Sequence, residues 1–167
     1  MKTAIVLGTS RQDGNTKNLV SLYQKHVTAD VFNLSDLLIS PYDYEHHNKN
    51  DAFLPLVKAL LSYDHIIFAS PVYWYSMSTQ MKMFFDRLSD ILTIEKSLGR
   101  KLRGKSCSVL ATGIDKSPPE CFEQPFELSA KYLGMLYKKM LYCSCDEQFI
   151  IEEHNIKLLN YIGTNET

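Results

Sequence analysis

The stretch GTSRQDGNTKN, residues 8–18, gathers side chains that can hold an anion. Its hydroxyl, amide and guanidinium donors belong to Thr9, Ser10, Arg11, Asn15 and Thr16. Gly14 lets the backbone turn inward, and a helix starting beside it would offer free N–H groups that favour negative charge. The stretch suits a terminal phosphate, and it equally suits an ordinary strand-to-helix loop in which Asn15 or Thr16 caps the helix.

The glycine spacing of this loop excludes two common phosphate-binding motifs. A Walker A loop needs four residues between its glycines and then a lysine, whereas five residues separate Gly8 from Gly14 and Asn15 follows. A dinucleotide fingerprint needs three glycines in a G-x-G-x-x-G pattern, and the loop has only these two. Neither motif is present.

A second candidate stretch is SPVYWYSMSTQMKMFFDR, residues 70–87, in which Tyr73, Trp74 and Tyr75 directly follow an apolar run. Aromatic faces can stack on a planar ligand, and they also pack in cores and subunit interfaces. A third stretch, LRGKSCSVLATG at 102–113, ends in another polar turn. A function must explain why three rings lie together at the end of a buried segment.

The elements around these stretches alternate between strands and helices. Short apolar runs predict five strands, at residues 3–8, 30–34, 65–70, 107–112 and 140–145. Helical spacing predicts helices at residues 16–26, 51–63, from 76–78 onward, within 119–133 and around 151–159, with Gly134 as a left-handed cap. Continuous apolar strands indicate a parallel sheet covered on both faces. We expect one domain over residues 1–167, a three-layer α/β sandwich.

In such a sheet, ligands bind beyond the carboxyl ends of the strands where the strand order reverses. For the flavodoxin-like order 2-1-3-4-5, that point lies between strands one and three. The loop at residues 8–18 and the aromatic segment follow these two strands. They are therefore expected to face one crevice.

Together the stretches GTSRQDGNT, SPVYWYSMSTQMKMFFDR and LRGKSCSVLATG resemble the NADPH-dependent FMN reductases and flavodoxin-like NAD(P)H quinone reductases, over most of residues 3–113. The resemblance implies a flavodoxin-like fold, FMN as cofactor, NAD(P)H as reductant, and a homodimer or higher homo-oligomer. The sequence departs from the family pattern at Tyr75, where glycine is common. It departs again after Gly113, where IDKSPPECFEQP replaces a glycine-rich run.

The resemblance also implies the cofactor-binding residues. The phosphate of FMN would be held by Ser10, Arg11, Asn15 and Thr16. The isoalloxazine ring would be lined by Pro71, Val72, Tyr73, Trp74, Tyr75, Ser76 and Met77, and approached by Thr112 and Gly113. Some relatives carry an iron–sulfur cluster on cysteines before the second helix, but residues 35–63 contain no cysteine, so none is expected.

The implied activity is hydride transfer from NAD(P)H through FMN to a small acceptor, by ping-pong turnover. Quinones, flavins, azo dyes, nitroaromatics and metal ions all fit as acceptors, and both NADH and NADPH fit as reductants. No catalytic side chain is expected, because the flavin supplies the chemistry. Two alternatives are a one-electron flavodoxin carrier, usually more acidic than this chain with its net charge of −1, and a cofactor-free interaction module.

Composition excludes several other classes. A net charge of −1 argues against a nucleic-acid partner. No apolar run approaches the roughly 18 residues of a membrane span, and the apolar run in MKTAIVLGTS is too short for a signal peptide, so a cytoplasmic location is expected. The four cysteines, with spacing that fits neither a disulfide framework nor a zinc site, are expected to be buried and reduced; they are Cys107, Cys121, Cys143 and Cys145.

A few remaining residues are expected to be structural. His46 and His47 are predicted to lie in a solvated loop. Asp86 and Arg87 are predicted to form an ion pair or a subunit contact. The methionines near the aromatic segment are predicted to pack in the core or an interface, and some of them to be exposed; they are Met77, Met81 and Met83.

Overall fold

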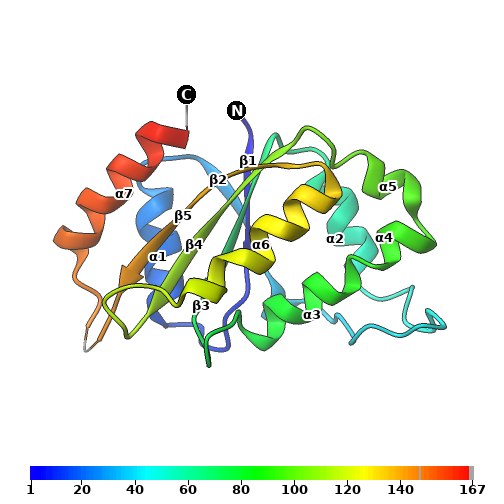
Figure 1. Cartoon of the computed structure of the whole chain (residues 1–167), viewed down its shortest axis with the longest axis horizontal. Helices are drawn as coiled ribbons and strands as arrows, with labels where there is room; N and C mark the ends of the chain where they lie inside the picture. Colours follow the sequence, from blue (N-terminus) through cyan, green and yellow to red (C-terminus); the bar gives the residue numbers. More distant parts are fainter. Residues whose placement is uncertain (147, 166–167) are drawn as a thin grey trace.

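A five-stranded parallel sheet forms the centre of the computed structural model, which describes residues 1–146 and 148–165 (Figure 1). Its strands are β1 (Thr3–Leu7), β2 (Ala29–Asn33), β3 (His65–Pro71), β4 (Ser106–Gly113) and β5 (Leu136–Ser144). They lie in the order β2-β1-β3-β4-β5 and all neighbours are parallel. The predicted flavodoxin-like order is confirmed.

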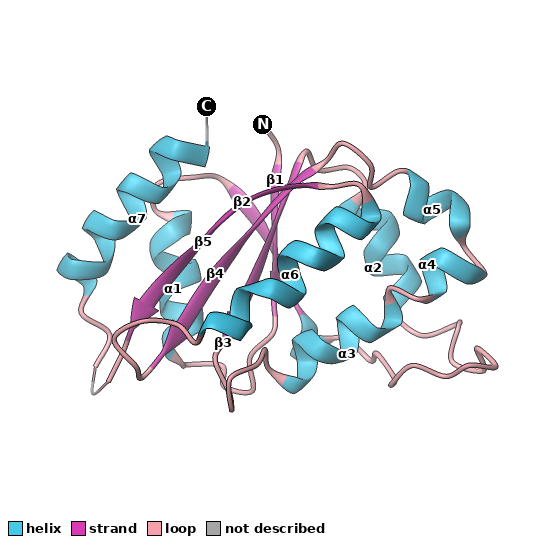
Figure 2. Ribbon diagram, viewed as in Figure 1, coloured by secondary structure: helices cyan, strands magenta, loops and turns pink. Residues whose placement is uncertain are grey.

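Helices cover both faces of the sheet (Figure 2). One face packs against α1 (Asn15–Gln24) and α7 (Ile151–Asn165). The other packs against α2 (Phe53–Leu60), α3 (Thr79–Arg87) and α6 (Glu120–Leu133). Short elements, which the sequence reading did not predict, complete the chain: η1 (Leu34–Asp36), α4 (Asp90–Thr93) and α5 (Lys96–Arg100). The three layers are those expected.

Strand pleating explains why the central strands β1 and β3 are buried on both faces. In β1, Ala4 and Val6 belong to the cluster under α2, α3 and α6, whereas Ile5 and Leu7 belong to the cluster under α1 and α7. Every residue of β1 and β3 is buried. A polar side chain on either face of these strands therefore needs a hydrogen-bond partner within the protein. Gly134, at φ 73°, ends α6 in the left-handed conformation, as predicted.

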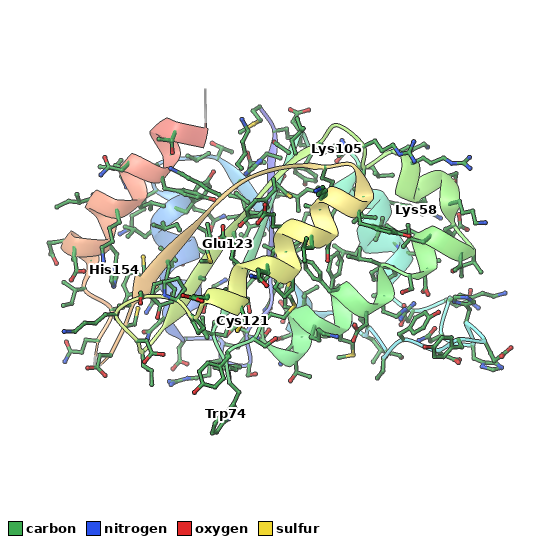
Figure 3. All side chains as sticks on the ribbon, viewed as in Figure 1. Lys58, Trp74, Lys105, Cys121, Glu123 and His154 are labelled. Carbon is green, nitrogen blue, oxygen red and sulfur yellow. The ribbon has the colours of Figure 1, made fainter. Side chains whose placement is uncertain are left out.

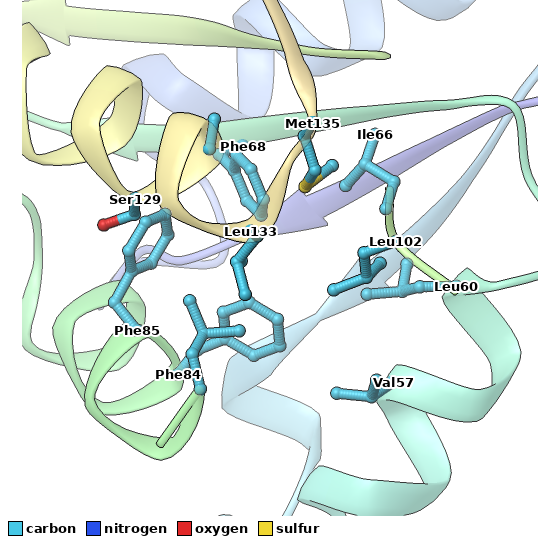
Figure 4. A pocket seen from close by; sticks show the side chains of 12 residues that line it. Val57, Leu60, Ile66, Phe68, Phe84, Phe85, Leu102, Ser129, Leu133 and Met135 are labelled. Atoms are coloured by element: carbon cyan, nitrogen blue, oxygen red, sulfur yellow. The ribbon is translucent and has the colours of Figure 1, made fainter. Parts of the chain in front are cut away.

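Phenylalanine rings fill much of the core between β3, α3 and α6. Phe68 packs within 5.1 Å of Phe85 between ring centroids, and Phe85 within 5.2 Å of Phe126. Beside them lies an apolar cavity of about 20 Å³ (Figure 4). Met77 and Met81 are buried in the same core, which confirms their predicted packing role, while Met83 is partly exposed.

A buried ion network ties the segment before α2 to α3 and α4. Arg87 is fully buried; its Nε donates to Asp90 Oδ2 at 2.9 Å and its Nη2 to Asp51 Oδ1 at 3.2 Å. Burial opposes the charge of Arg87, but these two carboxylates raise its pKa. Asp86 and Arg87 thus each form an ion pair, but not with each other: Arg87 pairs with Asp51 and Asp90, and Asp86 pairs with exposed Lys82 at 2.6 Å.

Two expectations about chemically active side chains need correction. His46 is mostly covered, and its Nδ1 lies 3.1 Å from Asp90 Oδ1, so only His47 is solvated as predicted. Cys121 is exposed on the first turn of α6, whereas the other three cysteines are buried. No helix in the described part of the chain is long and apolar enough to cross a bilayer.

Candidate functional site

A cavity of about 690 Å³ opens at the carboxyl edge of the sheet, where the chain leaves β1 and β3 in opposite directions. It brings together most of the residues that the sequence analysis singled out. The first loop contributes Arg11, Asn15 and Thr16; the segment after β3 contributes Pro71, Val72, Tyr73 and Trp74; the end of β4 contributes Thr112 and Gly113. We call it the carboxyl-edge cavity.

The start of α1 forms one wall. Gly14 is the N-cap residue, in an extended conformation, and no side chain caps the helix. The alternative in which Asn15 or Thr16 caps α1 is therefore wrong. Instead the Thr16 hydroxyl lies 2.7 Å from that of Thr112, in a buried contact that joins α1 to β4. A helix start without a side-chain cap leaves N–H donors for an anion.

Arg11 provides an exposed cation at the same wall. Its Nε donates to Asp13 Oδ1 at 3.3 Å, and both side chains are largely exposed. An exposed pair of this kind is weak, on the order of 1 kcal/mol or less, so the guanidinium can change partner at little cost. Arg11 can therefore turn to an anion bound at the start of α1.

The aromatic segment forms a tight hairpin. The Tyr73 N–H donates to Ser76 O at 2.9 Å, and the Ser76 N–H donates to Tyr73 O at 3.0 Å. Trp74 and Tyr75, at the corners, have φ of 47° and 66°. Positive φ at both corners is the type I′ turn, which favours Asn-Gly, and each such non-glycine residue costs about 1–3 kcal/mol.

The hairpin exposes its rings. Trp74 is 92 % exposed and Tyr75 63 %, and Trp74 projects beyond the ribbon in Figure 3. The backbone at Tyr75 follows a path suited to glycine, the residue that is common there in the family resembled. The Cys121 thiol, near Trp74 in the same view, donates to Tyr75 O at 3.5 Å. The segment keeps this turn despite the strain.

Serine side chains join the loops after β1 and β3. Ser78 Oγ donates to Gly8 O at 2.7 Å and accepts from the Met81 N–H at 3.2 Å, which caps α3. The Ser78 N–H donates to Ser70 Oγ at 3.0 Å. A Cβ on Gly8 would lie 2.9 Å from Met81 Cβ, so only glycine permits this approach. Sequence reasoning missed these serines, because their partners are distant in sequence.

The end of β4 is fixed by Tyr142. Its hydroxyl donates to Asp115 O at 2.7 Å, and burial raises its pKa to about 12. A Cβ on Gly113 would lie 2.6 Å from the same hydroxyl, which accounts for the glycine. Tyr142 thereby fixes the turn after Gly113, where this sequence lacks the glycine-rich run of the family pattern.

Four predicted residues lie outside the cavity wall. Ser10 faces solvent beside Gln80, whose Nε2 donates to the Ser10 hydroxyl at 3.2 Å. Tyr75 turns outward at the hairpin tip, Ser76 closes the hairpin, and Met77 is buried below it. The wall also includes residues that the sequence analysis did not assign to the cofactor site, namely Thr9, Asp13, Gly14, Thr79, Ile114 and Cys145.

Cys145 lines the cavity although no motif in the sequence predicted a role for it there. It follows β5, is buried, and has its Sγ 3.6 Å from His154 Nε2 on α7. Burial raises the pKa of Cys145 to about 11 and lowers that of His154. Both groups are therefore neutral near pH 7. Cys145 lines the cavity as a neutral thiol and is not a thiolate nucleophile.

A doubly wound parallel sheet with its cavity at the switch point between β1 and β3 is the flavodoxin-like class of protein. Within that class, the family model of the NADPH-dependent FMN reductases matches residues 1–143. The chain therefore belongs to the NADPH-dependent FMN reductase family. It is an NAD(P)H-dependent oxidoreductase with FMN as cofactor, as the resemblance implied.

Individual relatives agree with this assignment. The Bacillus subtilis protein YwqN, provisionally named as an NAD(P)H-dependent FMN-containing oxidoreductase, is 28 % identical over 148 residues, 83 % of this chain and 82 % of its own length. Two solved structures share the fold. The Trp repressor binding protein of Bacillus subtilis has a TM-score of 0.77 at 23 % identity, covering 98 % and 97 % of the two chains. General stress protein 14 of Treponema denticola, in complex with FMN, has a TM-score of 0.68 at 19 % identity with the same coverage.

Proposed function

We propose that FMN occupies the carboxyl-edge cavity and that the enzyme reduces a quinone, a flavin or a similar small acceptor by ping-pong turnover. The observation that carries this proposal is the pairing of an α1 start without a side-chain cap with an aromatic hairpin across one cavity. The cavity volume, about 690 Å³, lies within the range of cofactor sites. The residues present therefore fit the cofactor.

The chain would hold the phosphate at the start of α1. Backbone N–H groups there, with Asn15 and the Thr16 hydroxyl, offer neutral donors, and Arg11 offers a positive charge from the rim. Ser10 is proposed as a weaker contributor, because it lies outside the wall. The electrostatic contribution of the helix is strongest for a terminal phosphate, which carries the most charge.

The segment after β3 would receive the flavin ring and the substrates. Pro71, Val72 and Tyr73 line the cavity, and Thr112 and Gly113 approach from β4. FMN, when bound, accepts a hydride from NAD(P)H and passes two electrons to the second substrate. Trp74 offers an exposed ring face on which a planar nicotinamide or quinone stacks. Ser76, which closes the hairpin, and Met77, which is buried below it, would hold this wall in place.

Flavin content and steady-state kinetics test the proposal directly. The purified protein should show flavin absorbance or take up added FMN, and it should oxidise NAD(P)H with a water-soluble benzoquinone. Ping-pong turnover predicts parallel lines in double-reciprocal plots for the two substrates. Intersecting lines contradict ping-pong turnover, and a protein that takes up no FMN contradicts the whole proposal.

The phosphate assignment has its own test. Replacing Ser10 and Thr16 together by alanine should raise the Kd for FMN about tenfold or more, because hydrogen bonds to a charged group are worth about 1.5–3 kcal/mol. Titration of flavin fluorescence measures the Kd. Thr93→Val, which removes an exposed hydroxyl from α4, is the control and should leave it unchanged. An unchanged Kd in the double variant refutes the assignment.

The main rival is a one-electron carrier of the same fold. Oxidation of NAD(P)H by the purified protein alone, with quinone as acceptor, separates a reductase from a carrier, since a carrier needs a separate reductase. The net charge of −1 favours the reductase, because carriers use acidic surfaces to dock on partner proteins. A protein that exchanges single electrons but leaves NAD(P)H unoxidised would favour the carrier.

We further propose a homodimer whose second copy covers the aromatic hairpin, since Trp74 and Tyr75 are otherwise left in water. Light scattering with size-exclusion chromatography measures the mass, and a monomer at micromolar concentration contradicts the proposal. The single-domain organisation and the cytoplasmic location stay predictions, which limited proteolysis and fractionation of cells would test.

A further inference from the structure

Another cavity, of about 170 Å³, lies between α4, α5 and the end of α6. The helices α4 and α5 lie at the opposite end of the molecule from α7 (Figure 1). The cavity shares no residue with the carboxyl-edge cavity. We call it the basic cavity, because its lining includes three cations and no acidic residue; the cations are Lys96, Arg100 and Arg103.

The three cations of the basic cavity have no partners of their own. Within the described ranges, no side chain forms an ion pair or a hydrogen bond with the side chain of Lys96, Arg100 or Arg103. The two other arginines of the chain, Arg11 and Arg87, are each paired with a carboxylate. Lys96 and Arg100 are four residues apart on α5, a spacing at which like charges destabilise a helix. An anion bound in the cavity would relieve this repulsion.

Close packing of the backbone holds these cations in place. A Cβ on Gly99 would collide with Ile91 O, so α5 packs directly on α4 and the base of both α5 cations is fixed. Arg103 lies against the end of α6, where a Cβ on Gly134 would be 3.0 Å from its Cγ. Residues 101–105 then lead to β4, at the edge of the sheet where the parallel strands begin, which we call the amino edge.

The acidic groups of the surrounding elements do not neutralise the basic cavity. Four of them have other partners, namely Asp64 with the Lys2 N–H, Asp86 with Lys82, Asp90 with Arg87 and Glu123 with the Tyr137 hydroxyl. Glu95 and Glu127 neither line the cavity nor pair with its cations. Residues 91–105 contain five cations and only one acidic residue. The residues outside the described ranges flank α7 in sequence, and α7 covers the other face of the sheet.

The size and charge of the cavity favour a diphosphate group. Its volume is below the roughly 300–1,000 Å³ of pockets that enclose drug-sized ligands, so it suits an anionic group and not a whole cofactor. Guanidinium groups bind phosphate oxygens through two parallel N–H donors, and lysine binds them as a point charge. A single phosphate or carboxylate would leave part of this charge unpaired. Two linked phosphates offer enough oxygens to contact both arginines and the lysine.

We propose that the basic cavity binds a diphosphate group, free or as part of a nucleotide, between Arg100 and Arg103 with Lys96 beside it. Buried Ile91 and Leu133 close the cavity beneath these cations. The site is separate from the carboxyl-edge cavity, so FMN would not compete for it. The inference does not depend on the proposed acceptor or on ping-pong turnover.

Pyrophosphate is the probe, titrated into the FMN-saturated protein at low ionic strength and followed by amide chemical shifts in ¹⁵N-labelled samples. We expect saturable shifts at Gly99, Arg103 and Gly104, with a Kd of about 1 mM or below. Orthophosphate should bind at least about fivefold more weakly, because it contacts fewer of the cations. Sodium chloride at the same ionic strength should not produce the shifts.

ADP separates the two sources of a diphosphate. Affinity equal to or tighter than that of pyrophosphate indicates a nucleotide, and weaker affinity indicates free pyrophosphate; both results support the site. Three results overturn the proposal: no saturable shifts at residues 96–104, equal binding of orthophosphate, or shifts confined to residues 9–16.

Arg100→Gln and Arg103→Gln test the cavity, with Lys101→Gln as the matched control. Lys101 is an exposed cation of the same segment that does not line the cavity. Each arginine variant should bind pyrophosphate about tenfold more weakly, because a hydrogen bond between charged groups is lost. The control should weaken it by less than about threefold, since Lys101 acts only through screened charge. Unchanged affinity in the arginine variants, or equal weakening in all three, overturns the cavity as the site.

Discussion

The two edges of the sheet differ in how their polar groups are satisfied. At the amino edge, Tyr161, Ser108, His65 and Ser106 form a directed chain that is complete without a ligand. At the carboxyl edge, α1 starts without a side-chain cap, and a hairpin holds positive φ at Trp74 and Tyr75. Strain and unpaired donors gather where ligands bind, while satisfied networks stabilise the frame.

The largest expected effect concerns the frame on the carboxyl side. Arg87→Met should lower the free energy of unfolding by about 3–5 kcal/mol, because Asp51 and Asp90 would stay buried without their cation. Urea denaturation measures it. Lys82→Ala, which breaks the exposed pair with Asp86, is the control and should cost less than about 1 kcal/mol. Equal losses in the two variants would mean that the buried network is not what holds the loop at residues 37–52.

The buried His65 at the amino edge should make the folded protein less stable in acid. Burial holds the pKa of His65 at about 4, below its unfolded value of about 6.5. The unfolded chain therefore binds more protons between these values, and stability falls as pH drops from about 6.5 to 4. The loss from His65 is on the order of 3 kcal/mol.

Urea midpoints between pH 4.5 and 7.5 would measure this loss. His65→Gln should flatten the profile in part, since the pKa of buried His154 is also lowered. A His65→Gln profile as steep as that of the wild type would show that this histidine does not titrate differently on folding.

The smallest expected effect is at the hairpin, where one double variant tests the backbone strain and the role of the exposed rings by separate measurements. Trp74→Asn combined with Tyr75→Gly places the residues that a type I′ turn favours, so the apo protein should gain about 1 kcal/mol of stability. The same change removes two exposed rings and should slow reduction of a benzoquinone. Thermal unfolding and NAD(P)H oxidation give the two readouts. Tyr132→Gln, at an exposed ring on α6, is the control, and a hairpin variant that loses stability contradicts the strain.

The sequence predicted the frame better than the details of either edge. Apolar runs and helical spacing placed all five strands and the five longer helices, because burial on both faces leaves a clear pattern. The short helices α4 and α5 were not predicted, because four or five residues are too few to show the helical spacing of apolar residues. At the carboxyl edge, residue type located the loops, but it could not show that Ser10 faces Gln80.

The amino edge left no signal in the sequence that could be interpreted alone. Ser106 and Ser108 lie on the same face of β4. Their role comes from hydrogen bonds to His65, some forty residues earlier, and to Tyr161, some fifty later. The positive φ at Trp74 and Tyr75 was equally hidden, because aromatic residues usually avoid that conformation. Such features arise from tertiary contacts and not from local preference.

The outer strand β5 restricts how this protein can associate. Its register with β4 shifts between Cys107 and Val109, so that Lys138 and Lys139 oppose the single residue Ser108. A bulge with two adjacent lysines makes this edge a poor template for a strand from another molecule. Growth of the sheet into a continuous ribbon, the geometry that leads to fibrils, is thus disfavoured at β5. Self-association should instead use side-chain surfaces, which can close into a finite assembly.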